Sequence, residues 1–171
     1  MILPDVNVLV YAFREDAEDH EAYRGWLEEV VSRDEPFALA DVVLSGFLRV
    51  VTHPRVFRDP APVKRAVEFV EALRGQDNCV VLAPGRRHWG LFTGLCVEAH
   101  ATGNLIPDAF LAALAIEAGC EWITTDLDYA RFQGLHWRHP LREDRAPRPS
   151  RAPRSTRLRF TAAGASPSTH R

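Results

Sequence analysis

The stretch Met1-Ile2-Leu3-Pro4-Asp5-Val6-Asn7 is an apolar run that ends at a carboxylate. A carboxylate placed directly after a buried strand lowers the stability of a fold unless another group satisfies it. In open α/β sheets, the groups that carry chemistry lie at the carboxyl ends of parallel strands. Asp5 is therefore the first candidate functional residue, and its position predicts a strand of a parallel sheet just before it.

Three more aspartates lie beside apolar segments far along the chain. Asp108 opens an alanine-rich stretch, and Asp126 and Asp128 follow the run Trp122-Ile123-Thr124-Thr125. Carboxylates that converge without cationic partners repel one another, and a divalent cation is the usual remedy. Helix capping is the simpler alternative for Asp108 and Asp126, because aspartate also favours the residue before a helix. Together the four aspartates favour a metal-dependent hydrolase or nuclease.

Short apolar runs alternate with helical patterns over residues 1–141. This alternation, with short connections, predicts an α/β fold with a central parallel sheet between helices. Strands are expected near 2–3, 37–40, 80–82, 122–124 and 135–137. Helices are expected at 19–33, from a cap at 41 to about 52, between 62 and 75, at 87–101 and at 106–118. The four tryptophans, at 26, 89, 122 and 137, fall in apolar patterns and are expected in the core.

Residues 142–171 differ in composition from the rest of the chain. They contain eight arginines and two acids, a charge of +6, so residues 1–141 carry −8 because the whole chain carries −2. Arg, Pro, Ser, Thr and Ala dominate there and apolar periodicity is lost, which predicts a basic, disordered tail. The tail is either an electrostatic arm for RNA or an extension without a role.

The cysteines and the apolar runs bear on the compartment. Cysteines 79, 96 and 120 form no CxxC pair and lie in apolar contexts, which favours reduced core residues. The N-terminal residues lack the basic and long apolar regions of a signal peptide. No apolar run reaches the roughly 18 residues that span a bilayer. The sequence therefore predicts a cytoplasmic protein without membrane contact.

The carboxylates suit one kind of cofactor. Mg²⁺ binds one or two carboxylates together with waters and phosphate oxygens, and such an ion activates water for phosphodiester hydrolysis. Asp5, Asp108 and Asp126 are the candidate ligands and catalytic residues, and Asp128 is expected in a supporting role.

Other polar residues are candidates for supporting the carboxylates or binding substrate. Asn7 and Thr124 are placed to fix a carboxylate or a bound water by hydrogen bonds. Arg49, His53 and Arg55 lie within seven residues and are candidates for binding RNA phosphates. For Arg49 the alternative is a packing or pairing role within the fold.

Four blocks of the sequence resemble a known family. They are DVNVLVYA (Asp5 to Ala12), FLRVVTHPRVF (Phe47 to Phe57), GNLIPDAFLAALAIEAGC (Gly103 to Cys120) and TTDLDYARF (Thr124 to Phe132). In this order they are similar to PIN-domain ribonucleases, above all to VapC-type toxins of the subgroup abundant in mycobacteria and other actinobacteria. The resemblance covers roughly residues 1–141.

The resemblance implies a three-layer α/β/α PIN domain and Mg²⁺- or Mn²⁺-dependent cleavage of RNA, often tRNA or rRNA. It implies that Asp5 and Asp108 are metal ligands, that Asp126 matches a further acidic position with Asp128 beside it, and that Asn7 matches a polar position. It also implies a homodimer that a cognate VapB-like antitoxin holds inactive.

One position departs from the family pattern. Many members carry a glutamate in the helix after the second strand, where this chain has Gly46. The missing carboxylate leaves one or two metal ions as alternatives, with one ion fitting three carboxylates more readily. Glu15 or Asp16 is a candidate substitute ligand. The competing interpretation is a PIN-like module that binds nucleic acid or antitoxin through a degenerate, inactive site.

Overall fold

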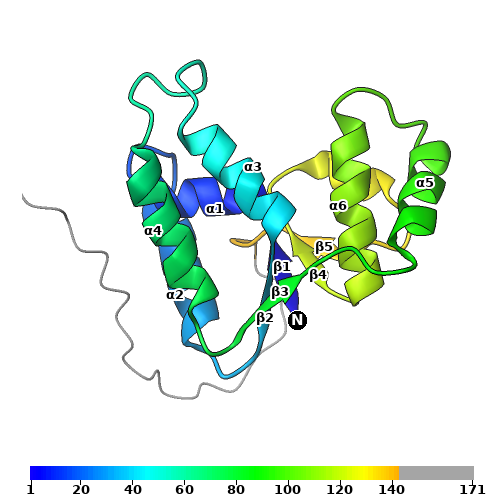
Figure 1. The fold of residues 1–171 in the computed structure, drawn as a ribbon, viewed down its shortest axis with the longest axis horizontal. Coiled ribbons are helices and arrows are strands. Elements are labelled where there is room, and N and C mark those ends of the chain that lie inside the picture. The colour runs from blue at the N-terminus through cyan, green and yellow to red at the C-terminus, as the bar shows by residue number, and fades with distance from the viewer. Residues whose placement is uncertain (143–171) are drawn as a thin grey trace, which may run out of the picture.

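A single parallel sheet organises the computed structural model, which describes residues 1–142 (Figure 1). Its strands are β1 (Ile2–Pro4), β2 (Phe37–Ala40), β3 (Cys79–Leu82), β4 (Glu121–Ile123) and β5 (Trp137–Arg138). The strand order is β3-β2-β1-β4-β5, and every neighbouring pair is parallel. The predicted parallel sheet is confirmed, and β1 lies at its centre.

Helices flank the sheet in two groups (Figure 1). They are α1 (Val6–Phe13), α2 (His20–Ser32), α3 (Asp41–Val51), α4 (Val63–Arg74), α5 (His88–Glu98) and α6 (Leu105–Ala118), with a 3₁₀ helix η1 (Leu127–Arg131) after β4. Helix α1 packs on α2 and α3, α3 packs on α4, and α5 packs on α6. Figure 1 shows α1 to α4 on one side of the sheet and α5 and α6 on the other. The predicted α/β architecture is confirmed.

The core forms where these layers meet the sheet. All four residues of β2 are buried, as expected for a strand covered on both faces. The rings of Phe13, Phe47 and Phe69 pack together between α1, α3 and α4, with centroids 5.1 to 5.3 Å apart. On the other side, Ala112 and Ala113 of α6 are fully buried, so their small side chains let this helix lie close to the sheet.

Three local expectations are wrong. Asp41 does not cap α3: it is the first residue of that helix, and its carboxylate pairs with Arg74. Helix α5 ends at Glu98 rather than near 101, because His100 adopts a left-handed backbone with φ of 48°. Trp89 is 69% exposed on α5 and is not a core residue. The ion pair with Arg74 accounts for Asp41, and the left-handed turn at His100 accounts for the end of α5.

Helix α1 is not expected from the sequence either. Its valines are β-branched residues that favour strands. The Asp5 side chain accepts a hydrogen bond from the Val6 amide at the start of the helix, and Val8, Leu9 and Val10 are buried. Capping and burial therefore stabilise a helix where propensity alone favours a strand.

The three cysteines are free, and Cys120 is buried while the other two are half-buried. No helix within residues 1–142 is long and apolar enough to cross a membrane. The predicted basic tail, 142–171, lies outside the described residues apart from Arg142.

Candidate metal centre

Asp5 lies where β1 ends and α1 begins. Its amide donates to the Ile123 carbonyl at 2.8 Å, which ties the end of β1 to the end of β4. Its carboxylate oxygen Oδ1 accepts from the Val6 amide at 2.6 Å. The side chain is thus held at the carboxyl edge of the sheet, and the whole residue is only 5% exposed.

Thr124 connects the two central strands through its hydroxyl. The residue is fully buried just after β4, and its Oγ1 donates to Oδ2 of Asp5 at 2.6 Å. The same Oγ1 accepts from the Asp126 amide at 3.1 Å and from the Asn7 side chain at 3.0 Å. One hydroxyl therefore fixes Asp5 and the backbone of Asp126 together.

Asn7 completes this network, as its position in the sequence predicts. Its Nδ2 donates to Oδ2 of Asp5 at 2.9 Å, and its Oδ1 accepts from the Thr125 amide at 3.4 Å. Oδ2 of Asp5 thus has two hydrogen-bond donors. Oδ1 has one, and so it retains a lone pair for a cation.

Asp108 reaches the same edge from α6. It is the fourth residue of that helix and lies in its first turn, after the cap residue Asn104, so the capping alternative is wrong for Asp108. The side chain is half-buried. Burial, followed by the charges of Asp126 and Asp128, raises the pKa of the Asp108 carboxyl, and a hydrogen bond with Tyr129 opposes the rise. Asp108 therefore lies close enough to Asp126 and Asp128 for their charges to act on its carboxyl.

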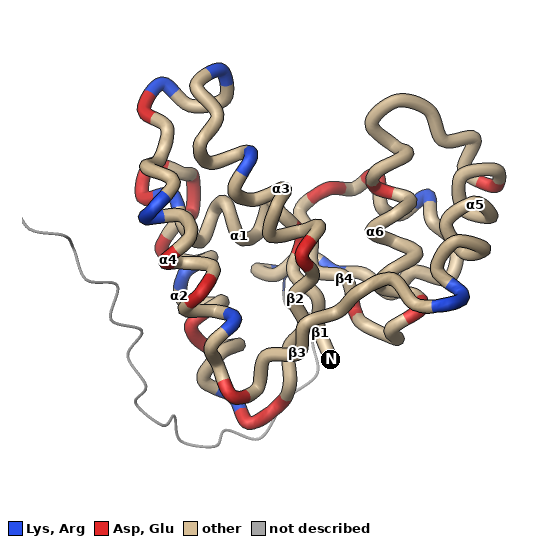
Figure 2. The backbone as a smooth tube through the Cα atoms, in the orientation of Figure 1, with Lys and Arg blue, Asp and Glu red and all other residues tan. Residues whose placement is uncertain are grey.

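Asp126 caps η1 and is also free to bind a ligand. Its Oδ1 accepts from the Asp128 amide at 2.8 Å, so the capping alternative is confirmed for this residue. The second oxygen accepts no hydrogen bond within the described part of the chain. Asp128 is exposed and pairs with Arg131 at 3.0 Å, which agrees with a supporting role rather than a primary ligand. Figure 2 shows acidic positions gathered where α6 begins and in the segment after β4.

The pKa of Asp5 reflects the acidic residues around it. Burial raises the pKa of Asp5 to about 6, and the nearby charges of Asp108 and Asp126 add to the rise, while hydrogen bonds from Thr124 and the Val6 amide oppose it. No ion pair within residues 1–142 involves any of the three aspartates. A cation between them would remove the repulsion that raises these pKa values.

The donor set fits a hard divalent cation, with one qualification of geometry. Asp5, Asp108 and Asp126 offer carboxylate oxygens, the ligands that Mg²⁺ prefers. Across residues 1–142, however, no three His, Cys, Asp or Glu side chains lie close enough to enclose a metal by themselves. An ion that keeps several waters needs only one or two of these carboxylates directly, so the arrangement suits Mg²⁺ better than a fully protein-bound metal.

Gly46 has a structural explanation. It lies on α3 against α1, where a Cβ atom would lie 2.9 Å from Cγ2 of Val6. Any side chain at position 46 would therefore require Val6 to shift. The suggested substitutes do not fill the gap, because Asp16 pairs with Arg14 and Glu15 pairs with Arg65.

Tyr129 is the residue that sequence reasoning missed. Its ring is buried against Trp122, with centroids 5.3 Å apart, and only 2% of the residue is exposed. Burial, together with the charges of Asp5, Asp108 and Asp126, raises the pKa of its hydroxyl far above the ordinary value, and its hydrogen bond goes to Asp108. An aromatic residue after an acidic motif is an ordinary core pattern, so the sequence alone offers no signal for this contact.

The basic residues lie along and beyond α3. Arg49 is exposed on α3 and makes no ion pair within residues 1–142, so that part of the chain offers no support for the pairing alternative. In the connection from α3 to α4, Nδ1 of His53 accepts a hydrogen bond from the Arg55 amide at 3.0 Å. Their binding to RNA stays a prediction.

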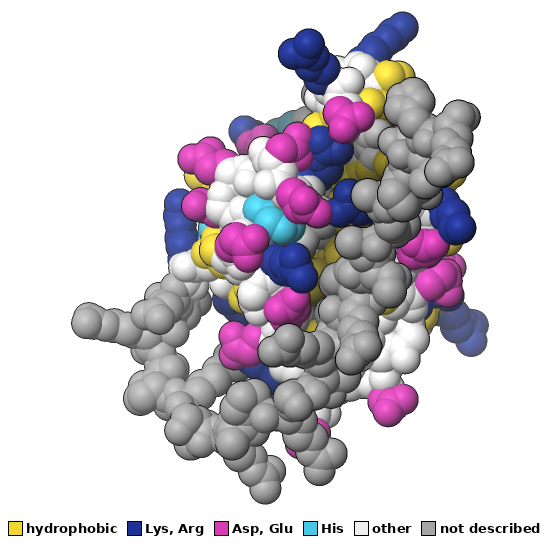
Figure 3. Space-filling view, turned by 90° about the vertical axis from the view of Figure 1, so that its left-hand side faces the viewer, with side chains coloured by type: hydrophobic (Ala, Val, Ile, Leu, Met, Phe, Trp, Pro, Cys, Tyr) yellow, Lys and Arg dark blue, Asp and Glu magenta, His cyan; other side chains and the backbone are white. Residues whose placement is uncertain are grey.

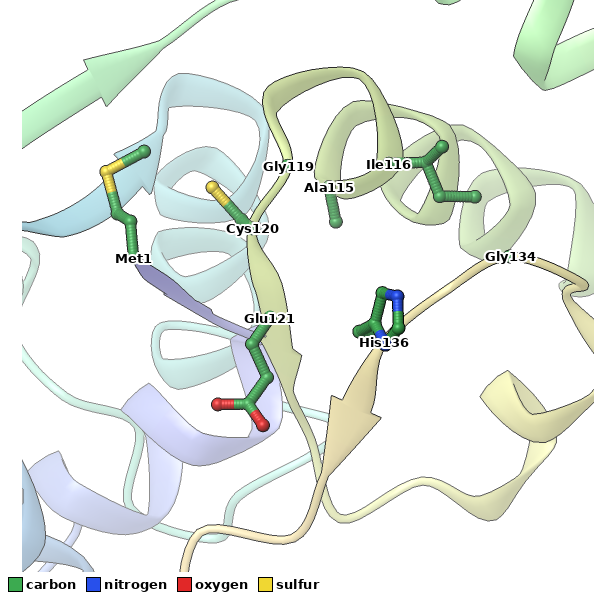
Figure 4. A pocket seen from close by; sticks show the side chains of 8 residues that line it. All are labelled: Met1, Ala115, Ile116, Gly119, Cys120, Glu121, Gly134 and His136. Atoms are coloured by element: carbon green, nitrogen blue, oxygen red, sulfur yellow. The ribbon is translucent and has the colours of Figure 1, made fainter.

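A pocket lies at the opposite edge of the sheet (Figure 4). Met1, Cys120, Glu121 and His136 help to line this space of about 260 Å³. Met1 precedes β1 and Glu121 begins β4, whereas Asp5 follows β1. The pocket therefore does not belong to the carboxylate edge.

Comparison with known proteins decides the family. A model of the PIN domain matches residues 2–135. Ribonuclease VapC43 of Mycobacterium tuberculosis (strain ATCC 25618 / H37Rv) is 48% identical over 141 residues, which cover 82% of this chain and 96% of that protein. The chain belongs to the PIN-domain VapC ribonucleases. The family resemblance seen in the sequence is confirmed, and with it a ribonuclease whose family implies a metal cofactor.

Solved structures agree in fold. VapBC2 from Rickettsia felis, bound to a DNA fragment from its promoter, matches with a TM-score of 0.62 at 17% identity, over 81% of this chain and 98% of that chain. Mycobacterium tuberculosis VapC20, a toxin that cleaves the sarcin-ricin loop, matches with a TM-score of 0.58 at 15% identity, over 80% of this chain and 99% of that one. At such identities the likeness confirms the PIN-like architecture and no more.

The first prediction concerns the Thr124 hydroxyl. We expect Thr124→Val to lower the free energy of unfolding by about 1–3 kcal/mol, because Asp5 and the Asp126 amide lose a buried hydrogen-bond partner. Mn²⁺ binding at pH 6 should weaken, since the hydroxyl helps to keep Asp5 ionised. Urea unfolding and calorimetric Mn²⁺ titration measure both effects.

Two control variants accompany this test. Thr124→Ser keeps the hydroxyl and should retain most of the metal affinity. Thr93→Val removes a hydroxyl that bonds only within the exposed surface of α5, and it should change neither property. A Thr124→Val protein with wild-type stability and Mn²⁺ affinity would contradict the assigned role.

The second prediction concerns pH. Because the folded-state pKa of Asp5 is about 6 and the ordinary value is 3.8, the metal-free fold holds a proton there that the unfolded chain releases. This contribution to stability is present below pH 3.8 and is lost as pH rises through 6. Between pH 5 and 7 it should amount to about 1 kcal/mol. Urea unfolding of the metal-free protein at both pH values tests it, and Asp5→Asn should show a correspondingly smaller loss.

A bound metal ion should reverse this dependence of stability on pH. Binding of a cation requires the ionised carboxylate, so Mn²⁺ affinity should fall as pH drops below 6. If the stability of the metal-free wild type changed with pH in the same way as that of Asp5→Asn, this result would contradict the raised pKa of the buried Asp5 carboxyl.

Proposed function

We propose that this chain is the toxin of a type II toxin–antitoxin pair, a Mg²⁺-dependent endoribonuclease that also accepts Mn²⁺ and cleaves tRNA or rRNA. The observation that carries the proposal is the set of Asp5, Asp108 and Asp126, which influence one another's charge and have no cationic partner within residues 1–142. Ribonuclease VapC43, at 48% identity, supports RNA as the substrate. The sarcin-ricin loop cleavage by VapC20 supports rRNA as one target class.

The aspartates and the polar residues beside them have different roles in this proposal. One or two of the carboxylates of Asp5, Asp108 and Asp126 would hold the cation directly, and the remaining carboxylate would bind its waters. A bound Mg²⁺ lowers the pKa of its water, orients the phosphodiester and stabilises the charge that develops on it. Thr124 and Asn7 keep Asp5 oriented, because both bind its Oδ2.

The partner proposals rest on the family and on the surface. VapBC2 was solved as a toxin–antitoxin pair, which supports a cognate VapB-like antitoxin for this chain. Trp89 and Val97 on α5 are 69% and 74% exposed, and apolar surface of this kind suits a protein interface such as that of a homodimer. A cytoplasmic location fits an enzyme that acts on tRNA or rRNA.

A second candidate function is a binding module with an inactive site. Gly46 in place of a glutamate and the absence of a ready-made metal cage within residues 1–142 favour it. Calorimetric titration with Mn²⁺ separates the two candidates. No metal binding, together with intact binding of RNA or antitoxin, would favour the module, whereas saturable Mn²⁺ binding lost in Asp5→Asn favours the enzyme.

The third prediction tests the enzyme directly. Asp108→Asn should reduce RNA cleavage by about 100-fold or more, because a metal's contribution to phosphoryl chemistry amounts to several kcal/mol. The metal-free free energy of unfolding should be unchanged or raised, since repulsion with Asp126 and Asp5 is relieved. Sequencing of RNA 5′ ends after induction measures cleavage and identifies the target, and urea unfolding measures stability.

The controls for this test are a matched aspartate and metal removal. Asp77→Asn changes an exposed aspartate between α4 and β3 and should leave cleavage unchanged. Excess EDTA should abolish cleavage by the wild type, and added Mg²⁺ should restore it. Full cleavage by Asp108→Asn, or in EDTA, would refute the proposed mechanism.

A further inference from the structure

Unpaired cations concentrate on one part of the surface. Seven arginines of the described chain pair with carboxylates, at positions 14, 24, 33, 65, 74, 131 and 138. Arg49, Arg55 and Arg58 make no ion pair in residues 1–142, although they lie within ten residues and are exposed. Asp59 is the one acid among residues 49–59. The segment therefore carries a net positive charge on an otherwise acidic body.

Arg49 lies on α3, and Arg55 and Arg58 lie in the connection from α3 to α4. Figure 1 places this connection at the upper end of the molecule, and Figure 2 shows basic positions along α3 and in the connection. Figure 3 shows basic side chains projecting at the same end, beside apolar ones. Val56, which lies between Arg55 and Arg58, is 54% exposed and is available to contact a base or sugar.

The connection is held in place by specific contacts. Arg14, at the end of α1, donates to the Asp59 carbonyl at 2.8 Å, and its guanidinium lies over the Phe57 ring at 4.2 Å. The Ala61 amide donates to the Val51 carbonyl at 2.9 Å, which closes the base of the loop. Arg55 and Arg58 are therefore presented from an ordered loop, and little backbone conformational entropy is lost when they bind.

Helix α3 links this loop to the carboxylate edge. Gly46 lies against Val6, the neighbour of Asp5. With a rise of about 1.5 Å per residue, Arg49 lies about 4.5 Å further along the helix axis and the loop begins a few ångströms beyond it. A nucleic acid strand that places a phosphate at Asp5 can thus follow α3 to the loop within a few nucleotides.

We infer that Arg49, Arg55 and Arg58 form a phosphate-binding track for the RNA strand that flanks the cleaved bond. This inference rests on the proposed ribonuclease function. It adds the path that the RNA strand beside the cleaved bond takes across the protein surface. The arginines neutralise backbone phosphates, which the acidic body would otherwise repel. Arg14 is a positioning residue that supports the loop.

The test compares charge-matched variants in RNA binding. In an Asp108→Asn background, which prevents cleavage, R55Q/R58Q should bind a single-stranded RNA oligonucleotide more weakly than its parent. The slope of log affinity against log salt should be shallower by about 0.7 for each lost contact. Arg86 is an exposed arginine between β3 and α5 that makes no ion pair within the described part of the chain, so Arg86→Gln should leave the slope unchanged.

Arg14→Met tests the support of the loop. It should weaken RNA binding, whereas Mn²⁺ affinity should stay at the wild-type value, because Asp5 precedes α1 and Arg14 follows it, about 13 Å further along the helix axis. In the cleavage-competent protein, R55Q/R58Q should raise KM with little change in kcat.

The outcomes separate this inference from the proposed function. A wild type that cleaves RNA, with R55Q/R58Q showing an unchanged salt slope, overturns the track alone. A wild type that neither binds Mn²⁺ nor cleaves RNA overturns the proposed function. If R55Q/R58Q binds RNA normally but loses an acidic protein partner, the surface serves that partner and the inference is wrong.

Discussion

The hydrogen bond from the Thr124 hydroxyl to Asp5 is the interaction on which the carboxylate edge depends. A carboxylate as buried as Asp5 stays ionised only when donors satisfy it, and Thr124 is the donor whose hydrogen bond lowers its pKa most. The bond joins residues 119 positions apart in the sequence. It therefore forms only when β1 and β4 are neighbours in the sheet, so the site and the fold are made by the same pairing.

The distribution of ion pairs separates structural acids from functional ones. Asp16, Asp41 and Glu15 each face an arginine, and their charges are neutralised within the fold. Asp5 and Asp108 face other acids instead, and their pKa values rise because burial and repulsion disfavour the ions. Perturbed carboxyl pKa values cluster at functional sites, which makes the unpaired acids more informative than the acidic residues as a whole.

Sequence periodicity predicted the elements that obey it and missed those set by tertiary contacts. The Phe37–Ala40 strand and the helix that ends before Gly75 have clear punctuation and were predicted closely. Asp126 has two roles, cap and candidate ligand, which position alone cannot separate. The contact of Tyr129 with Asp108 and that of Val6 with Gly46 join residues far apart in the chain, and no local pattern encodes either.

The contact of Gly46 with Val6 also bears on the number of metal ions. A glutamate at position 46 would add a fourth carboxylate, but its Cβ would lie 2.9 Å from Cγ2 of Val6, which would have to shift. Of the remaining acids, Asp5 retains a lone pair on Oδ1, and Asp126 has one oxygen outside its capping bond. Two ions held close together would need bridging carboxylates with both oxygens available, which these hydrogen bonds preclude at Asp5. The local packing therefore favours a single, largely hydrated ion.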